Sequence, residues 1–329
     1  MTRIGLVLGA GGSVGQAYQA GVLAALENDL GWDPRSADVI VGTSAGSVTG
    51  GLLRLGVPAS ELAAWAVKAP LSVDRREVRN LLDGERPEFP PFTINHWLRP
   101  WRLPSPQLVA HLARRPWTFR PSVAAMTLMP TGSVDMIELA PGLRDAEPDE
   151  WPSGLLICAA RRNSGARTVF GRYGSPQATL TQALAASCAI PGYFAPVAID
   201  GVEYFDGGVH SPSNADVLCD ENLDLVIAVS PMSAAGGLPR TPDGLYRYSV
   251  HRRLERELAR LARTGATIVR IEPAARSLTA MGINMMADDR SAAVVQAAFV
   301  ETGRYIASRP VIKRLAPIDR RFTAQRINA

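Results

Sequence analysis

The N-terminal part of the chain alternates between short apolar runs and turns rich in glycine, and this alternation limits the fold more than any other feature. Residues 3–8 are predicted as a strand, followed by a glycine loop at 9–15 and a helix. A second buried strand at 38–41 leads into a tight turn at 42–46 and another helix. Strands that alternate with helices in this way form a parallel sheet. We therefore expect an α/β fold with a central, mostly parallel sheet flanked by helices.

Charged residues are missing from three long stretches, although they make up 20% of the 329 residues. The stretches are Ile4–Leu26, Val39–Leu53 and Tyr173–Ile199. The first and third are long enough to cross a bilayer, but their glycines, prolines and glutamines do not suit a spanning helix. We interpret all three as buried parts of a soluble domain.

The remaining elements fit a single domain over residues 1–329. Strands are expected at 155–160, 168–170, 225–229 and 267–271, helices at 180–187, 248–264 and 291–306, and an extended segment up to Tyr204. Residues 70–150 differ, with twelve of the 25 prolines and three of the six tryptophans. This variable insertion is either an excursion packed on the core or a cap, including Trp97 and Trp101, that shapes an apolar acyl pocket. Residues 307–329 form a basic C-terminal tail.

Charge and cysteine content narrow the classes of partner. The net charge is +4 without a dense basic block, so we expect no nucleic-acid partner. Weak attraction to an anionic membrane surface, about 1 kcal/mol per basic residue, stays open. Cys158, Cys188 and Cys219 lack metal-ligand spacing, so we expect reduced core thiols, no metal and no cofactor. Reduced thiols favour a cytoplasmic protein. The apolar run after Arg3 is too short for a signal peptide and is interpreted as the first strand.

The sequence Gly42-Thr43-Ser44-Ala45-Gly46 lies between a predicted strand and a predicted helix. A G-x-S-x-G sequence in this position is typical of a nucleophile elbow, where glycines remove Cβ atoms that would collide at a strained turn. Ser44 would stand at a helix N-terminus, where backbone dipoles favour developing negative charge. Ser44 is therefore the candidate nucleophile.

The loop that contains Gly9, Gly11, Gly12 and Gly15 has two functional interpretations. In one it is an oxyanion hole, whose backbone N–H groups stabilise a tetrahedral intermediate by about 3 to 4 kcal/mol each. In the other it binds a nucleotide, although its G-x-G-x-x-x-G spacing and the absence of a ribose-binding acid after the second strand depart from that pattern. A glycine loop kept only for packing is the third interpretation.

Asp206, followed by Gly207 and Gly208, ends a strand-like segment. An acid followed by two residues without side chains can approach another loop closely, although an ordinary turn has the same pattern. Asp206 is one candidate base for Ser44. A conventional Ser/Asp/His triad with His210 or His251 is the alternative.

Taken in order, these motifs resemble the patatin-like phospholipase family. The matching segments are 6–12, 21–23, 42–46, 186–196 and 206–208. The resemblance covers about 3–70 and 150–230, and it does not cover the insertion. It implies a three-layer α/β hydrolase that acts on phospholipid or other lipid esters and that could contact a membrane surface peripherally.

The resemblance also implies roles for particular residues. Ser44 and Asp206 would form a catalytic dyad without a histidine, and the amides of Gly11 and Gly12 would form the oxyanion hole. Two positions depart from the family pattern, because Ala10 replaces a glycine and Val14 replaces a basic residue. The second change removes a positive charge near the oxyanion or an anionic head group. A catalytically silent lipid-binding member of the family is the remaining alternative.

Overall fold

The computed structural model describes residues 2–72, 144–234 and 242–316, together with isolated positions between 78 and 136 and residue 318. Most of the predicted insertion, including Trp97 and Trp101, and most of the basic tail lie outside the described residues. Among the helices that are described, none is both long and apolar enough to cross a bilayer. Cys158 and Cys188 are buried, and no cysteine is in a disulfide.

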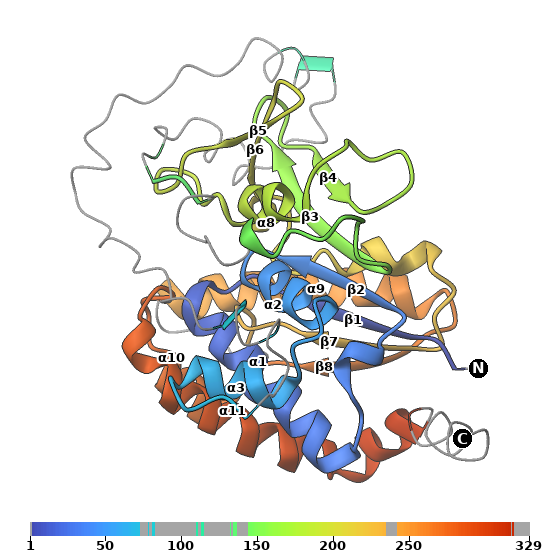
Figure 1. Cartoon of the computed structure of the whole chain (residues 1–329). Coiled ribbons are helices and arrows are strands. Elements are labelled where there is room, and N and C mark those ends of the chain that lie inside the picture. The colour runs from blue at the N-terminus through green and yellow to red at the C-terminus, as the bar shows by residue number, and fades with distance from the viewer. Residues whose placement is uncertain are drawn as a thin grey trace.

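Within the described residues, a mixed sheet of eight strands forms the centre of the molecule (Figure 1). The strand order is β5-β6-β3-β2-β1-β7-β8, and β4 pairs with β3 outside this path. The strands are β1 (Ile4–Leu8), β2 (Val39–Thr43), β3 (Leu155–Arg161), β4 (Arg167–Phe170), β5 (Val197–Ile199), β6 (Val202–Asp206), β7 (Leu225–Val229) and β8 (Thr267–Ile271). Strands β3, β2, β1, β7 and β8 run parallel, while β4 and β6 are antiparallel to β3. The expected α/β fold with a mostly parallel sheet is confirmed.

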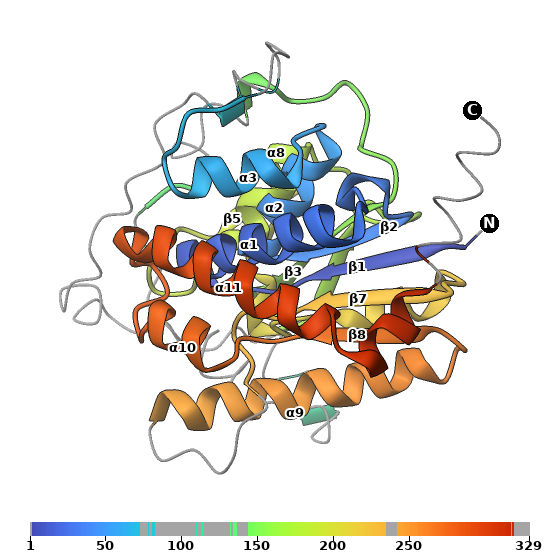
Figure 2. The same ribbon diagram turned by 90° about the horizontal axis from the view of Figure 1, so that it is seen from below.

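Helices cover both faces of this sheet (Figure 2). One layer holds α1 (Gly12–Leu30), α2 (Ala45–Arg54), α3 (Ala59–Ala66), α8 (Leu180–Cys188), α10 (Ala275–Met281) and α11 (Ser291–Ile306). The other layer holds α9 (Pro242–Ala262) and the short helix η5 (Ala215–Asp220). Leu6 and Leu8 pack on the first layer and Val7 on the second, so every residue of β1 is buried. Burial on both faces explains the continuous apolar runs in the sequence.

Three local predictions needed correction. Helix α9 begins at Pro242 rather than near residue 248, because a proline and the acidic Asp243 in its first turn start a helix before its apolar pattern begins. The short helix α10 was not predicted. The segment expected only as extended chain forms the hairpin β5–β6, which turns at Asp200 and Gly201, both with positive φ.

Candidate active site

Ser44 occupies the sharp turn between β2 and α2. Its φ of 53° lies in the left-handed region, which costs a non-glycine residue about 1–3 kcal/mol. The surrounding chain holds this conformation, since the Ser44 N–H donates to Ser187 Oγ at 2.9 Å and the Ser44 carbonyl oxygen accepts from Ser47 Oγ at 2.6 Å. The Ser44 side chain is buried. This strained strand-to-helix turn has the geometry of a nucleophile elbow.

The two glycines that flank Ser44 are required by close contacts with backbone atoms. A Cβ on Gly42 would lie 2.5 Å from Ser47 Cα. A Cβ on Gly46 would lie 2.0 Å from the carbonyl oxygen of Leu8. The G-x-S-x-G spacing therefore lets α2 pack directly against the ends of β1 and β2.

Strand β3 brings Ser44 and Asp206 together, although they are far apart in the sequence. Cys158 pairs with Thr43 of β2, and the next residue of β3, Ala159, pairs with Asp206 of β6. Both residues of β3 also pair with β4 on the opposite edge. Strands β2 and β6 therefore lie end to end along one edge of β3. The chain that leaves β2 at Ser44 meets the chain that ends β6 at Asp206.

Asp206 is buried, and the Ser44 hydroxyl interacts with its carboxylate. Its Oδ1 also accepts the N–H of Gly208 at 2.6 Å. Burial raises the pKa of Asp206 from 3.8 to about 6, while the hydrogen bonds from Ser44 and Gly208 act in the opposite direction. A Cβ on Gly207 would lie 2.1 Å from the Cys158 carbonyl oxygen, so this glycine lets the turn lie against β3. The site therefore holds a carboxylate of increased basicity beside the elbow serine.

The glycine loop between β1 and α1 is anchored at its start. The N–H groups of Gly9 and Ala10 donate at 2.9 and 2.7 Å to carbonyl oxygens of β7 and of the segment that follows Asp206. Within the described part of the chain, the N–H groups of Gly11 and Gly12 have no hydrogen-bond partner. These two amides lie at the N-terminus of the 19-residue helix α1, where the helix dipole favours an anion.

Gly11 and Gly15 close this loop tightly. A Cβ on Gly11 would lie 2.6 Å from Gly15 Cα and 3.0 Å from Pro231 Cβ. A Cβ on Gly15 would lie 3.3 Å from the same proline atom. Larger residues at these positions would separate the loop from the chain that leaves β7.

The glycine loop, the elbow and the Asp206 turn converge. A Cβ on Gly46 of the elbow would lie 2.8 Å from the Gly9 carbonyl oxygen. A Cβ on Gly208 would lie 3.5 Å from Ala10 Cβ. All the residues predicted for the site therefore lie in or beside three adjoining turns at the carboxyl ends of β1, β2 and β6.

The segment after α10 packs against the start of α1. The carbonyl oxygen of Met285 accepts the N–H of Val14 at 3.1 Å, and a Cβ on Gly12 would lie 2.9 Å from Met286 Sδ. Met281 is fully buried, whereas Met285 and Met286 lie beside the glycine loop.

Two fully buried amide side chains hold these loops together and were not predicted from the sequence. Gln19 Nε2 donates to the Gly9 carbonyl oxygen at 2.6 Å, and Gln19 Oε1 accepts from Thr49 Oγ1 of α2 at 2.7 Å. Asn214 Nδ2 donates to Thr43 Oγ1, next to the elbow serine, at 3.1 Å. The sequence signal for Gln19 was its position as a polar residue inside a charge-free stretch. The sequence around Asn214 carried no comparable signal.

The two histidines considered for a conventional triad are held by other groups. His251 Nδ1 lies 2.8 Å from Glu272 Oε1, and His251 Nε2 lies 3.5 Å from Glu255 Oε1. His210 Nδ1 lies 3.4 Å from the Gly165 carbonyl oxygen. None of these contacts involves the elbow serine.

The two departures from the family pattern differ in their surroundings. Val14 is fully buried and packs in the core with the apolar residues of α1 and α11. Ala10 is 5% exposed and lies beside the Asp206 turn, next to Gly208. Position 14 therefore contributes packing rather than charge, and position 10 accommodates a methyl group.

Comparisons with known proteins identify the family of this chain. A model of the family described as "Patatin-like phospholipase" matches residues 6–218, which include the glycine loop, the elbow and Asp206. Similar curated proteins include uncharacterized NTE family proteins of Mycobacterium bovis and Mycobacterium tuberculosis, each 28% identical over 242 residues. These alignments cover 72% of this chain and 51% of each relative, so the chain spans about half the length of the curated relatives it matches.

Among solved structures, VipD from Legionella pneumophila is similar with a TM-score of 0.42 and 15% identity, over 92% of this chain and 66% of that one. The family model, in contrast, matches well over half of the chain and all three site loops. The chain belongs to the patatin-like phospholipase family.

Proposed function

We propose that the chain is a lipid acyl hydrolase that cleaves carboxylic esters with Ser44 as the nucleophile and Asp206 as its base. The observation that carries this proposal is the placement of the two side chains at strand ends aligned by β3, where the Ser44 hydroxyl acts on the buried carboxylate of Asp206. The strained backbone of Ser44 and the family membership support it. Family membership also favours a lipid substrate.

The raised pKa of Asp206 makes it a stronger base than an ordinary carboxylate, which a serine–aspartate dyad requires. An ordinary carboxylate is a weak base for a hydroxyl group. A pKa of about 6 instead of 3.8 makes the carboxylate about a hundredfold more basic. It still leaves about 90% of Asp206 ionised at pH 7. Burial thus improves the base without neutralising it under ordinary conditions.

The proposed reaction has two halves. Ser44 Oγ attacks the ester carbonyl carbon while Asp206 accepts the hydroxyl proton, and the N–H groups of Gly11 and Gly12 stabilise the oxyanion. The intermediate expels the alcohol, which takes the proton from Asp206, and leaves an acyl-serine. Asp206 then removes a proton from water, the resulting nucleophile attacks the acyl-serine, and the fatty acid leaves as Ser44 regains its proton.

Labelling and kinetics test this proposal. A fluorophosphonate should modify Ser44, and Ser44→Ala should abolish both labelling and hydrolysis of short-chain nitrophenyl esters. Asp206→Asn should lower kcat by about a thousandfold or more, because it removes the base. Ser249→Ala and Asp220→Asn, at exposed positions, are the matched controls.

Three results would contradict the dyad. Full activity in both Ser44→Ala and Asp206→Asn would exclude it. A loss of several thousandfold in a His210 or His251 variant, with Asp206 dispensable, would establish the conventional triad instead. An unlabelled Ser44 in folded protein would indicate a catalytically silent lipid-binding protein.

The substrate class needs a separate assay. Hydrolysis of phospholipids, lysophospholipids, monoacylglycerols and simple esters should show a preference for a lipid ester over the simple esters. Sedimentation with anionic and with neutral vesicles tests peripheral membrane contact, which should be stronger on anionic vesicles because the chain is basic.

A further inference from the structure

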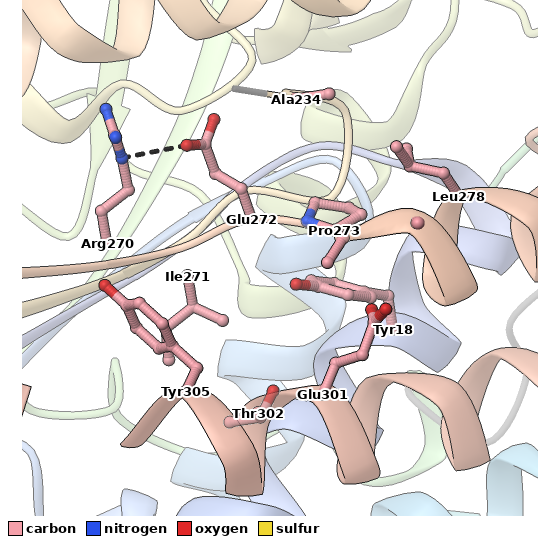
Figure 3. Close-up of a pocket in the computed structure, with 12 residues that line it drawn as sticks. Tyr18, Ala234, Arg270, Ile271, Glu272, Pro273, Leu278, Glu301, Thr302 and Tyr305 are labelled. Atoms are coloured by element: carbon pink, nitrogen blue, oxygen red, sulfur yellow. Dashed lines mark ion pairs between the residues drawn. The ribbon is translucent and has the colours of Figure 1, made fainter. Parts of the chain in front are cut away.

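A cavity of about 510 Å³ lies at the carboxyl end of β8, away from the dyad (Figure 3). Its lining comes from α1, α10, α11, the end of β8 and the segments that follow β7 and β8. In the sheet, β1 and β7 separate β8 from β2, so the cavity lies about 14 Å along the sheet from the elbow. None of the predicted site residues lines this cavity.

Tyr18 is the most buried polar group of the lining, with 2% of its surface exposed. Its hydroxyl points toward the space bounded by Tyr305 and Pro273 (Figure 3). Among the residues that the structure describes, this hydroxyl has no hydrogen-bond partner. The hydroxyl oxygen is not among the fully buried polar atoms, so it is accessible from the cavity and an occupant of the cavity can hydrogen-bond to it.

Two carboxylates of the lining are fixed in position. Glu301 accepts the backbone N–H groups of Arg276 and Ser277 at 2.8 and 3.2 Å. Glu272 Oε2 lies 2.9 Å from Arg270 Nε (Figure 3), while its Oε1 faces the histidine of α9. Neither acid needs to move to accept a ligand.

The charge around the Tyr18 hydroxyl is negative. Arg270 is the one basic residue among those that line the cavity, and it is shared between Glu272 and Glu255. Burial raises the pKa of Tyr18 well above its ordinary value, and the charges of Glu301 and Glu272 raise it further. The field of both carboxylates therefore reaches the hydroxyl.

The remaining walls are aromatic and apolar. The rings of Tyr18 and Tyr305 face the cavity together with Ile271, Pro273 and Leu278 (Figure 3). Aromatic faces beside carboxylates in an apolar wall attract alkylated ammonium groups, which gain cation–π attraction and are cheap to desolvate. The two carboxylates would repel an anion, and a neutral apolar ligand would gain no electrostatic attraction from them.

We propose that this cavity is a second ligand site that binds an organic ammonium group, with Glu272 and Glu301 as counter-charges and the Tyr18 hydroxyl as a hydrogen-bond partner for a ligand oxygen next to the ammonium. The group could be carried by a lipid head group or by a free small amine. Both present the same cation to the same residues.

Calorimetric titration of the full chain tests the proposal with choline and with 3,3-dimethylbutan-1-ol, which has the same shape without the charge. Choline should bind. The affinity for the neutral analogue should be lower by about tenfold or a larger factor, because the analogue loses about 1.4 kcal/mol of charge interaction. Tyr18→Phe and Glu272→Gln should each weaken choline binding about fivefold or more. The matched substitutions at exposed positions, Tyr173→Phe and Glu150→Gln, should leave it unchanged.

Glycerophosphocholine distinguishes the two sources of the cation. Tighter binding of glycerophosphocholine than of choline assigns the site to a lipid head group, and the reverse order assigns it to a free amine. Equal affinity for choline and its neutral analogue would overturn the proposal. So would the absence of a binding signal at millimolar choline, or unchanged binding in a folded Tyr18→Phe variant. Binding is measured without hydrolysis, so this outcome is independent of the dyad.

Discussion

Replacing Asp206 with asparagine should stabilise the protein while it removes activity. The folded-state pKa of about 6 exceeds the ordinary value of 3.8 by about 2 units, because the carboxylate is buried. At about 1.4 kcal/mol for each unit, burying the ionised form costs the folded state about 3 kcal/mol. Asparagine has a similar shape and can still accept the Gly208 N–H, but it carries no charge.

The sign of the effect follows from proton binding. Because the folded-state pKa is the higher one, between about pH 4 and pH 6 the folded protein keeps a proton that the unfolded chain has lost. The contribution of Asp206 to the free energy of unfolding therefore falls as the pH rises through this window and stays low above it. Asp206→Asn should gain up to about 3 kcal/mol over the wild type at neutral pH and very little near pH 4.

Urea denaturation of the wild type and of Asp206→Asn at pH values from about 4 to 8 measures this difference directly. Taking the difference at each pH cancels the titration of other groups. Asp220→Asn, on an exposed acid, is the control and should show no such dependence. A difference that stays constant across the whole range would refute the reasoning, because Asp206 would then titrate alike in the folded and unfolded states.

The remaining predictions concern the pH profile and two backbone contacts. In the wild type, kcat/KM should rise about tenfold per pH unit and level off above pH 6, as the Asp206 base ionises; a profile flat from pH 4 to 8 would contradict its role. Ser187→Ala removes the acceptor of the elbow N–H and should cost about 1–3 kcal/mol in urea denaturation and lower kcat more than it changes KM. Gly46→Ala should give no folded protein, since its Cβ would lie 2.0 Å from the Leu8 carbonyl oxygen, and a soluble active variant would be the opposing result. Gly31→Ala, with open space around its Cβ and a positive φ, should cost only about 1–2 kcal/mol in urea denaturation.

Local sequence signals were sufficient for most of the elements that build the sheet. The apolar runs at β7 and β8 and the helix α11 have the predicted boundaries, because each is set by burial of a periodic pattern. The early start of α9 and the short helix α10 were missed, because the first turn of a helix and a short helix show little apolar periodicity. The Asp200-Gly201 turn did carry a hairpin signal that the sequence interpretation overlooked.

The individual residues of the candidate site were predicted from the order of the motifs. The strand pairings and hydrogen bonds that position these residues were not predicted. Ser44 was recognisable because its turn needs glycines at fixed positions, which is a local steric requirement. The positioning roles of Gln19, Ser187 and Asn214 were not recognisable, because each depends on a partner from a distant segment.

The strand–loop–helix alternation, the steric form of the elbow and the burial of the charge-free stretches could be predicted from the amino-acid sequence, since they follow from local periodicity and backbone sterics. The pairing of β3 with both β2 and β6, which places Asp206 beside Ser44 away from solvent, is known only from the three-dimensional structure. Strand pairing and desolvation depend on segments distant in the chain. The pKa of Asp206, and with it the chemistry of the site, is therefore a property of the fold.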